Sequence, residues 1–204
     1  MPKLERNLII ERCPHCNVDK PNLIIAAQFE TNSFNNSNVR HWKAYSCQRC
    51  GGVTTAWAYP ANMEIREMFP KSLKVDESIP GRAKEYLNQA IDSKHAPAGS
   101  IMLSASSVDS MLKEKGYKVG NLYSRINKAV DDHLITKEMA EWAHDVRLDA
   151  NDQRHADEDA ELPNEDDAQR IIDFTLALAQ FLFVMPSRVQ NGINQAKIVN
   201  ETKQ

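Results

Sequence analysis

The sequence predicts an α+β protein, in which a β-rich metal-binding module is followed by a bundle of about five helices. Two observations support this fold class. All four cysteines of the 204-residue chain fall in two Cys-x-x-Cys pairs, Cys13–Cys16 and Cys47–Cys50. Up to about residue 59 the apolar residues form short runs typical of strands, whereas after Pro80 they recur at the three- and four-residue spacing of amphipathic helices.

The two cysteine pairs predict a closed four-thiolate metal site. A Cys-x-x-Cys turn lets both thiolates reach one tetrahedral ion, and two such turns complete the coordination shell. We expect structural zinc, because four sulfurs leave no open position for water or substrate. A dithiol redox pair is the alternative, and His15 and His41 are expected on the surface. The expected ligands are Cys13, Cys16, Cys47 and Cys50.

Residues 1–59 are therefore expected to form a zinc ribbon, whose small core the metal would stabilise. The thirty residues between the cysteine pairs predict an extended hairpin with an Asn- and Ser-rich tip at 32–38. Residues 60–79 contain Pro60 and Pro70 and show weak periodicity, so we expect a connector that packs on the helices. Strands are expected at 23–29, 39–46 and 53–59.

Residues 80–186 are expected to form the helical bundle. Its second helix should end near Gly116, which suits the position after a helix C-terminus. Thr136 and Asn164 are expected to cap the fourth and fifth helices, and Pro186 is expected to stop the fifth. The five apolar stripes begin near Ala83, Ile101, Leu122, Met139 and Ile171. Residues 187–204 are expected to be a polar, loosely held tail.

The last predicted helix carries two apolar stripes, one containing Ile171 and the other Phe174. A helix that is apolar on two sides is usually buried on two sides. The second face would be covered by another subunit or by the zinc module, and we favour a homodimer.

The bulk composition indicates a cytoplasmic protein with no membrane span. The longest apolar run, 174–185, is interrupted by Thr175 and Gln180 and is too short to cross a bilayer. The N-terminus lacks the apolar stretch of a secretory signal, and thiols arranged for metal suit a reducing compartment. Net charge is −3, but residues 1–59 carry seven Lys and Arg against four Asp and Glu, which is compatible with nucleic acid.

Cations and aromatic residues alternate close to the second cysteine pair. Such a mixture suits single-stranded nucleic acid, which binds through base stacking and phosphate contacts. The alternative is that these aromatic residues form the small core of the ribbon. The candidate nucleic-acid-binding residues are Arg40, Trp42, Lys43 and Arg49, and further along the chain Arg154.

Arg147, Asn151 and His155 recur every four residues at the end of the fourth predicted helix, so they form a row of polar groups. A guanidinium can clamp a phosphate, an amide can orient an oxygen and an imidazole can exchange protons. These groups would suffice for metal-independent RNA cleavage, in which the 2′-OH attacks the neighbouring phosphate. The alternative is that Arg147 braces the bundle through an ion pair with Asp109 or Asp145.

This row resembles the HEPN superfamily (higher eukaryotes and prokaryotes nucleotide-binding), and more closely its branch catalogued as domain of unknown function 4145, over residues 80–185. Many HEPN members are endoribonucleases of toxin–antitoxin or antiphage defence systems, and they work as dimers whose two motifs meet in one cleft. The resemblance therefore implies RNA as substrate and an antitoxin or complex partner. It implies Arg147 as phosphate clamp, Asn151 as positioning group and His155 as general acid/base.

Two other functions remain open at this point. One is a non-catalytic zinc-ribbon adaptor or nucleic-acid-binding module that assembles with a partner through its helical domain. The other is a purely structural metalloprotein in which Arg147 only braces the bundle.

Overall fold

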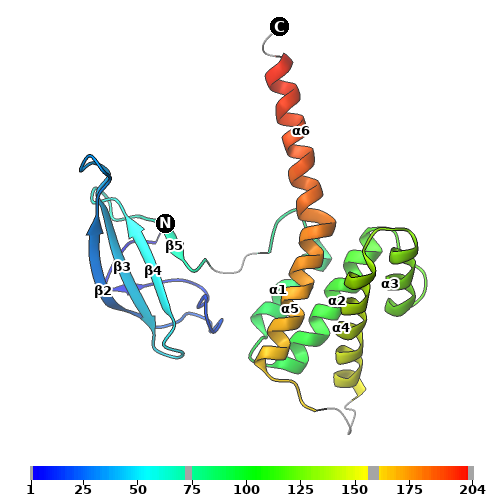
Figure 1. The fold of residues 1–204 in the computed structure, drawn as a ribbon. Helices are drawn as coiled ribbons and strands as arrows, with labels where there is room; N and C mark the ends of the chain where they lie inside the picture. The colour runs from blue at the N-terminus through cyan, green and yellow to red at the C-terminus, as the bar shows by residue number, and fades with distance from the viewer. Residues whose placement is uncertain (1, 72–74, 156–160, 202–204) are drawn as a thin grey trace. The chain divides into compact units, whose positions relative to one another are not determined.

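The computed structural model confirms the α+β class and describes residues 2–71, 75–155 and 161–201. The chain divides into two compact units, Met1–Lys74 and Val75–Gln204 (Figure 1). The first unit contains the β-sheet and the four cysteines, and the second contains the helices.

The first unit is built on a five-stranded antiparallel sheet in which every strand pairs with the next one along the chain. The predicted strands correspond to β2, β3 and β4, and β2 and β3 form the hairpin expected between the cysteine pairs. Register shifts between Ile25 and Ala27 and between Trp57 and Ala58 interrupt the regular pairing. The strands are β1 (Asn7–Leu8), β2 (Leu23–Thr31), β3 (Arg40–Cys47), β4 (Val53–Ala58) and β5 (Ile65–Phe69).

The segment 60–79, expected to be a connector, contributes to both units. Its first half supplies β5, which pairs with β4 and places the buried Ile65 in the core of the sheet unit. Its last residues, Val75 and Ile79, are buried in the core of the helical unit. The strand is only five residues long and is followed by Pro70, so its alternation is too short to stand out in the sequence.

One face of the sheet carries the core of the first unit, and this core is small. Tyr45 is fully buried there, and its hydroxyl donates to the carbonyl of Glu5 at 2.8 Å. Burial raises the pKa of Tyr45 to about 12, so the phenol stays protonated as a donor. The buried members of this core are Leu4, Leu8, Cys13, Leu23, Tyr45, Cys47, Ala56, Ala58 and Ile65.

The second unit is a helical bundle with one continuous apolar core. Buried hydroxyls cross-link its first two helices: Ser107 of α2 donates to the carbonyl of Ala83 in α1, and Ser100 donates to that of Ala90. Each such bond contributes about 1 kcal/mol. The helices are α1 (Gly81–Asp92), α2 (Pro97–Glu114), α3 (Leu122–Asp131), α4 (Lys137–His155), α5 (Glu165–Ala179) and α6 (Met185–Glu201).

The predicted helix ends are confirmed where a side chain or a glycine defines them. Asn164 and Asp167 form a capping box at α5, and Thr136 Oγ1 accepts from the amide of Met139 at α4. Gly116 follows α2 with φ of 102°, a conformation that favours glycine. At the start of α3, Asn121 accepts from the amide of Ser124 and provides a cap that was not predicted.

Pro186 does not stop the last helix, and the expected polar tail continues it as α6. A π-helical turn, Gln180–Val184, joins α5 to α6. Proline lacks an amide proton and its ring clashes with the carbonyl four residues earlier, so the wider turn accommodates it without ending the helix. Figure 1 shows α6 extending past the other helices of this unit.

The continuous helix 165–198 is the one described helix that is long and apolar enough to cross a membrane. Half of its most apolar window is buried within the fold, which is equally true of a core helix in a water-soluble bundle.

Candidate metal centre and phosphate-binding pocket

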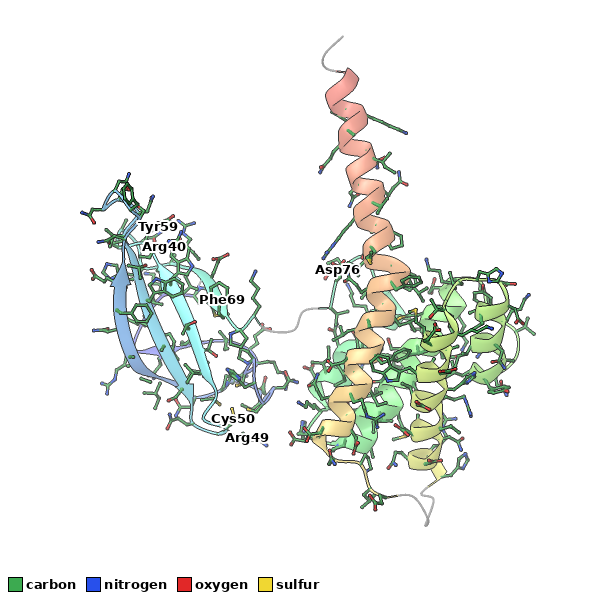
Figure 2. The ribbon with its side chains drawn as sticks, in the orientation of Figure 1. Arg40, Arg49, Cys50, Tyr59, Phe69 and Asp76 are labelled. Carbon is green, nitrogen blue, oxygen red and sulfur yellow. The ribbon has the colours of Figure 1, made fainter. Side chains whose placement is uncertain are left out.

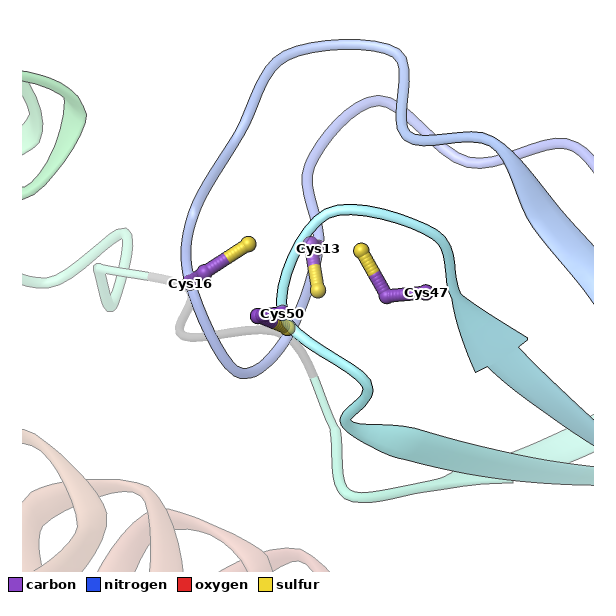
Figure 3. Close-up of side chains that lie close together, drawn as sticks. All are labelled: Cys13, Cys16, Cys47 and Cys50. Atoms are coloured by element: carbon purple, nitrogen blue, oxygen red, sulfur yellow. The ribbon is translucent and has the colours of Figure 1, made fainter.

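The four cysteine sulfurs come together at one end of the first unit. Cys13 and Cys16 lie in the loop before β2, Cys47 ends β3, and Cys50 lies in the turn before β4. Figure 3 shows the four side chains converging from these two loops, and all four sulfurs lie within 4.8 Å of one another. None of the four is in a disulfide.

The two cysteine turns share one backbone geometry. In each, the amide four residues after the first cysteine donates to that cysteine's carbonyl: Asn17 to Cys13 at 3.0 Å and Gly51 to Cys47 at 2.8 Å. Both donors have positive φ, 55° for Asn17 and 72° for Gly51. Asparagine and glycine tolerate this conformation better than other residues do. The two turns are therefore near copies that present two sulfurs each.

A metal ion fits this cluster by chemistry and by size. A tetrahedral ion with metal–sulfur bonds near 2.3 Å requires sulfurs about 3.8 Å apart, which lies within the 4.8 Å limit that encloses all four sulfurs. Burial raises the pKa of Cys16 to about 12, so without a cation this thiol stays protonated. Burial also acts to raise the pKa of Cys47. The backbone amides of Cys50 and Arg49, together with the side chains of Cys13 and Cys50, outweigh burial and lower that pKa to about 7. A bound cation would favour all four thiolates.

His15 holds the two turns together and does not take part in the sulfur cluster. Its Nε2 lies 2.9 Å from the carbonyl oxygen of Val53, after the second turn. Its ring covers Gly52 so closely that a Cβ at that position would lie 2.4 Å from the ring carbon Cγ. Glycine at position 52 is thus required by the contact between the two turns.

The candidate nucleic-acid residues of the first unit do not share one surface. Arg40 and Trp42 lie on the face of β3 opposite the core, where the Arg40 guanidinium sits 4.2 Å from the Trp57 ring centroid. Lys43 lies on the other face, and its Nζ donates to the carbonyls of Leu4 and Glu5. Figure 2 shows Arg49 beside Cys50, at the opposite end of the sheet from Arg40.

In the helical unit, Arg147 and Asn151 line a pocket of about 210 Å³ between α2, α3 and α4. Arg154 lines the same pocket and also an adjoining one of about 330 Å³ that includes Arg82. Arg147 and Arg154 are seven residues apart, about two helical turns, so they share a face of α4. The lining residues of the first pocket are Ala105, Asn121, Leu122, Tyr123, Arg147, Ala150, Asn151 and Arg154.

Arg147 is held without a counter-ion among the residues that the structure describes. Its guanidinium carbon lies 5.3 Å from the ring centroid of Tyr123, and its Nε is buried with no hydrogen-bond partner in the described part of the chain. Asp109, one of the two carboxylates considered as its partner, instead binds Arg125 at 2.6 Å and Lys113 at 2.5 Å. The structure gives Arg147 no bracing ion pair within the described ranges.

The pocket has the properties of an anion site. The N-terminus of α3 lies at its wall, where Asn121 caps one amide and the first backbone amides of the helix have no intrahelical acceptor. Two guanidiniums and the amide of Asn151 add further donors. Few acceptors face them, so a phosphate would be favoured over a neutral ligand.

His155 is the predicted site residue that the structure does not place in this pocket. It is exposed at the last residue of α4 and is absent from the pocket lining. Eight residues of helix rotate it about 80° from Arg147 and move it about 12 Å along the axis. It lies one helical turn beyond Asn151 along α4.

The structure also places His144 and Tyr123 beside Arg147, which was not predicted. Their ring centroids are 4.8 Å apart, and His144 Nε2 lies 2.9 Å from Oδ1 of Asn127. Nε2 therefore carries the proton, and Nδ1 is buried without a partner among the described residues. Burial, and then the positive charge of Arg147, lower the pKa of His144.

The lowered pKa predicts that acid destabilises the helical unit. An unfolded histidine takes up its proton near pH 6.5, whereas folded His144 does so only at lower pH, so stability falls as pH drops through this range. We expect His144→Gln to reduce the fall in the free energy of unfolding between about pH 7 and about pH 5.5. Urea unfolding at a series of pH values, monitored by the helical circular dichroism signal, measures this free energy. The matched control is His95→Gln, which replaces an exposed histidine; equal acid sensitivity in both variants would contradict the assignment.

Comparison with known proteins places the helical unit in a family. No curated protein and no solved structure matches the chain. Residues 88–198, more than half of the chain, match the family described as Domain of unknown function (DUF4145). The matched region begins in α1 and includes the whole pocket-forming segment of α2, α3 and α4. The chain therefore belongs to the Domain of unknown function (DUF4145) family.

Proposed function

We propose that this chain is an RNA-directed HEPN-like protein, a cytoplasmic, metal-independent endoribonuclease of a defence or toxin–antitoxin type system. The observation that carries the proposal is the pocket beside Arg147, where two guanidiniums, an amide side chain and a helix N-terminus face the same space. That donor set matches a phosphodiester.

Arg147 would bind the phosphate through the terminal nitrogens of its guanidinium, because the residue lines the pocket and its Nε is buried without a partner within the described residues. Asn151 would orient a phosphate or ribose oxygen, and Arg154 would bind the next phosphate along the strand. A strand following α4 from this pocket would pass His155, which lies one turn beyond Asn151.

In the proposed reaction the 2′-oxygen attacks the neighbouring phosphorus and the bond from phosphorus to the 5′-oxygen breaks. A base removes the 2′-proton and an acid donates a proton to the leaving 5′-oxygen, which produces a 2′,3′-cyclic phosphate and a 5′-hydroxyl. His155 would supply one of these proton transfers, and the guanidiniums would stabilise charge on the phosphoryl oxygens.

We further propose that the four cysteines hold structural zinc and that the protein is a homodimer, with an antitoxin or other complex partner. Thiolates in tetrahedral array are typical of zinc. Dimerisation is supported by four exposed apolar side chains that follow one i, i+4 row along the end of the long helix. They are Phe181, Met185, Val189 and Ile193.

The test is RNA cleavage in a magnesium-free buffer containing EDTA, with the protein-bound metal measured in the same sample. We expect wild type to cut mixed single-stranded RNA and leave 2′,3′-cyclic phosphate ends, and His155→Ala to cut about 10²- to 10⁴-fold more slowly. His133→Ala, which changes another exposed histidine of this unit, is the matched control. Equal cleavage by wild type and His155→Ala would exclude the assigned role.

The second candidate function is a non-catalytic adaptor that binds RNA or a partner through the helical unit. The position of His155 outside the pocket lining favours it, because the pocket then binds phosphate without an acid or base inside it. This function predicts RNA binding that depends on Arg147, together with no cleavage by wild type.

A further inference from the structure

The face of the sheet opposite the core carries a cluster of aromatic rings centred on Trp42. Phe29 lies nearly parallel to Trp42, with ring centroids 6.0 Å apart and an angle of 7° between the planes. Trp57 lies 6.0 Å from Trp42 and Phe69 lies 6.4 Å from it. Four neighbouring strands, β2 to β5, thus contribute one ring each to a single surface (Figure 2 labels Phe69).

The strand register explains why these rings share a face. Phe29 pairs with Trp42, and Trp42 pairs with Trp57, so directly opposed residues project to the same side. Tyr45 and Cys47 of β3 lie at odd offsets from Trp42 and project into the core on the other side. Phe29 is 50% exposed and Phe69 is 43% exposed, whereas Trp57 is only 6% exposed, so the cluster is a surface patch built around one buried ring.

Hydrogen bonds at the ring edges fix the two tryptophans. Trp42 Nε1 donates to Thr31 Oγ1 at 2.9 Å, and Trp57 Nε1 donates to Glu67 at 3.2 Å. The indole donors are thereby satisfied within the unit. Trp57 is itself buried, so the exposed ring surface of the cluster is supplied mainly by Phe29 and Phe69. Arg40 lies over Trp57, so a guanidinium plane and a positive charge border the same surface.

The net charge of the sheet unit indicates which class of ligand this aromatic surface would bind. Residues 1–74 contain ten Lys and Arg against six Asp and Glu, whereas residues 75–204 contain fifteen against twenty-two. The aromatic cluster therefore lies on the cationic unit of an acidic chain. Flat rings bordered by arginine on a positively charged unit match the bases and phosphates of a single strand.

We propose that this surface, formed by Phe29, Trp42, Phe69 and Arg40, binds single-stranded RNA by stacking its bases on the rings and contacting its backbone with Arg40. This inference rests on the proposed function, since it supplies the means by which the chain holds RNA outside the pocket beside Arg147. Base stacking makes the contact tolerant of sequence.

The experiment measures binding of the full-length, metal-loaded protein to a fluorescein-labelled oligouridylate by anisotropy at several salt concentrations. All variants carry Arg147→Ala, so that the strand is not cut and the contribution of the pocket is reduced equally throughout. We expect Phe29→Ala and Trp42→Leu to bind about 10- to 100-fold more weakly with an unchanged salt slope. Arg40→Ala should reduce the salt slope by about 0.7, the value for one phosphate contact on a single strand.

The matched control is Phe34→Ala, which removes a fully exposed ring at the hairpin tip of the same unit, away from the cluster. Equal affinity of Phe29→Ala and Phe34→Ala would overturn the proposal, as would affinity that depends only on charge. Because Trp42→Leu also removes packing within the sheet unit, its metal content and helical signal are measured beside those of Phe29→Ala to check that the variant is folded.

Two further measurements, binding of oligothymidylate and a separate cleavage assay, distinguish the possible outcomes. Ring-dependent binding of oligothymidylate as well as oligouridylate supports stacking that does not read the ribose, whereas binding of oligouridylate alone supports an RNA-specific surface. Ring-independent binding of both assigns the surface to another ligand, such as a protein, and overturns the proposal. The proposed cleavage is scored separately in protein with intact Arg147, so ring-dependent binding without cleavage contradicts only the nuclease.

Discussion

Removing the proposed zinc ion should unfold residues 1–74 and leave the helical unit intact. The core of the first unit contains nine buried residues, and two of these, Cys13 and Cys47, belong to the sulfur cluster. So small a core cannot offset the chain entropy of ordering five strands, and binding of a structural zinc ion supplies about 10–16 kcal/mol. Loss of the ion therefore removes the main stabilising contribution to this unit.

Two-dimensional amide NMR during titration with a strong chelator measures this effect residue by residue. We expect the signals of residues 8–69 to collapse to random-coil positions, while those of α2 and α4 stay in place and helical circular dichroism changes little. Replacing the exposed Cys50 by serine should have the same effect. Loss of most helical signal on chelation, or a first unit that keeps its dispersed signals, would contradict the division into two independently stabilised units.

Replacing Arg147 by alanine should abolish most phosphate binding in the helical pocket. A charge-assisted hydrogen bond is worth about 1.5–3 kcal/mol, so the loss corresponds to about 10- to 150-fold in affinity. Arg147→Lys should recover only part of it, because an ammonium keeps the charge and lacks the planar pair of donors. The change should not unfold the bundle, since Arg147 has no ion pair within the described part of the chain.

The NMR resonance of the Arg147 Nε–H group reports phosphate binding in the helical pocket, since that nitrogen is buried and has no partner in the described residues. We expect it to shift when a nucleoside monophosphate is added, and we expect the affinity to fall in Arg147→Ala. Arg170→Ala is the matched control, because Arg170 pairs with Asp149 and Asp167 on the surface and lines neither pocket. Equal phosphate affinity in the two variants would show that the pocket is not an anion site.

The four-cysteine cluster and the principal strands could be predicted because their sequence signals are local. Two residues between cysteines dictate a turn, and alternation in β3 dictates which side chains share a face. The same alternation separates Lys43 from Trp42. Lys43 lies an even number of residues from Cys47, whose sulfur points into the four-cysteine cluster, so both project to the same side of β3. Counting alternate residues back from Cys47 is enough to assign Lys43 to the core side of the sheet.

The helical site shows where local reasoning fails. A spacing of four residues suggests a row of side chains on one helix face. A helix has 3.6 residues per turn, however, so each step of four rotates the side chain further from the first. After two turns Arg154, and not His155, lies on the face of Arg147. Tyr123 and His144 come together only through packing of α3 on α4, and no spacing in the chain encodes that contact. The walls of the pocket therefore depend on tertiary packing and could not be predicted, whereas Arg147, which lines the pocket, could be identified from the sequence.

The π-helical turn at Gln180–Val184 changes how the end of the chain should be compared with its relatives. Such a turn accommodates one extra residue, so everything after it is rotated by about 100° relative to an uninterrupted wheel. A family member that lacks one residue here would present a different side of its terminal helix to the surroundings. Single-residue gaps in this segment therefore indicate a changed orientation and not a trivial difference in length.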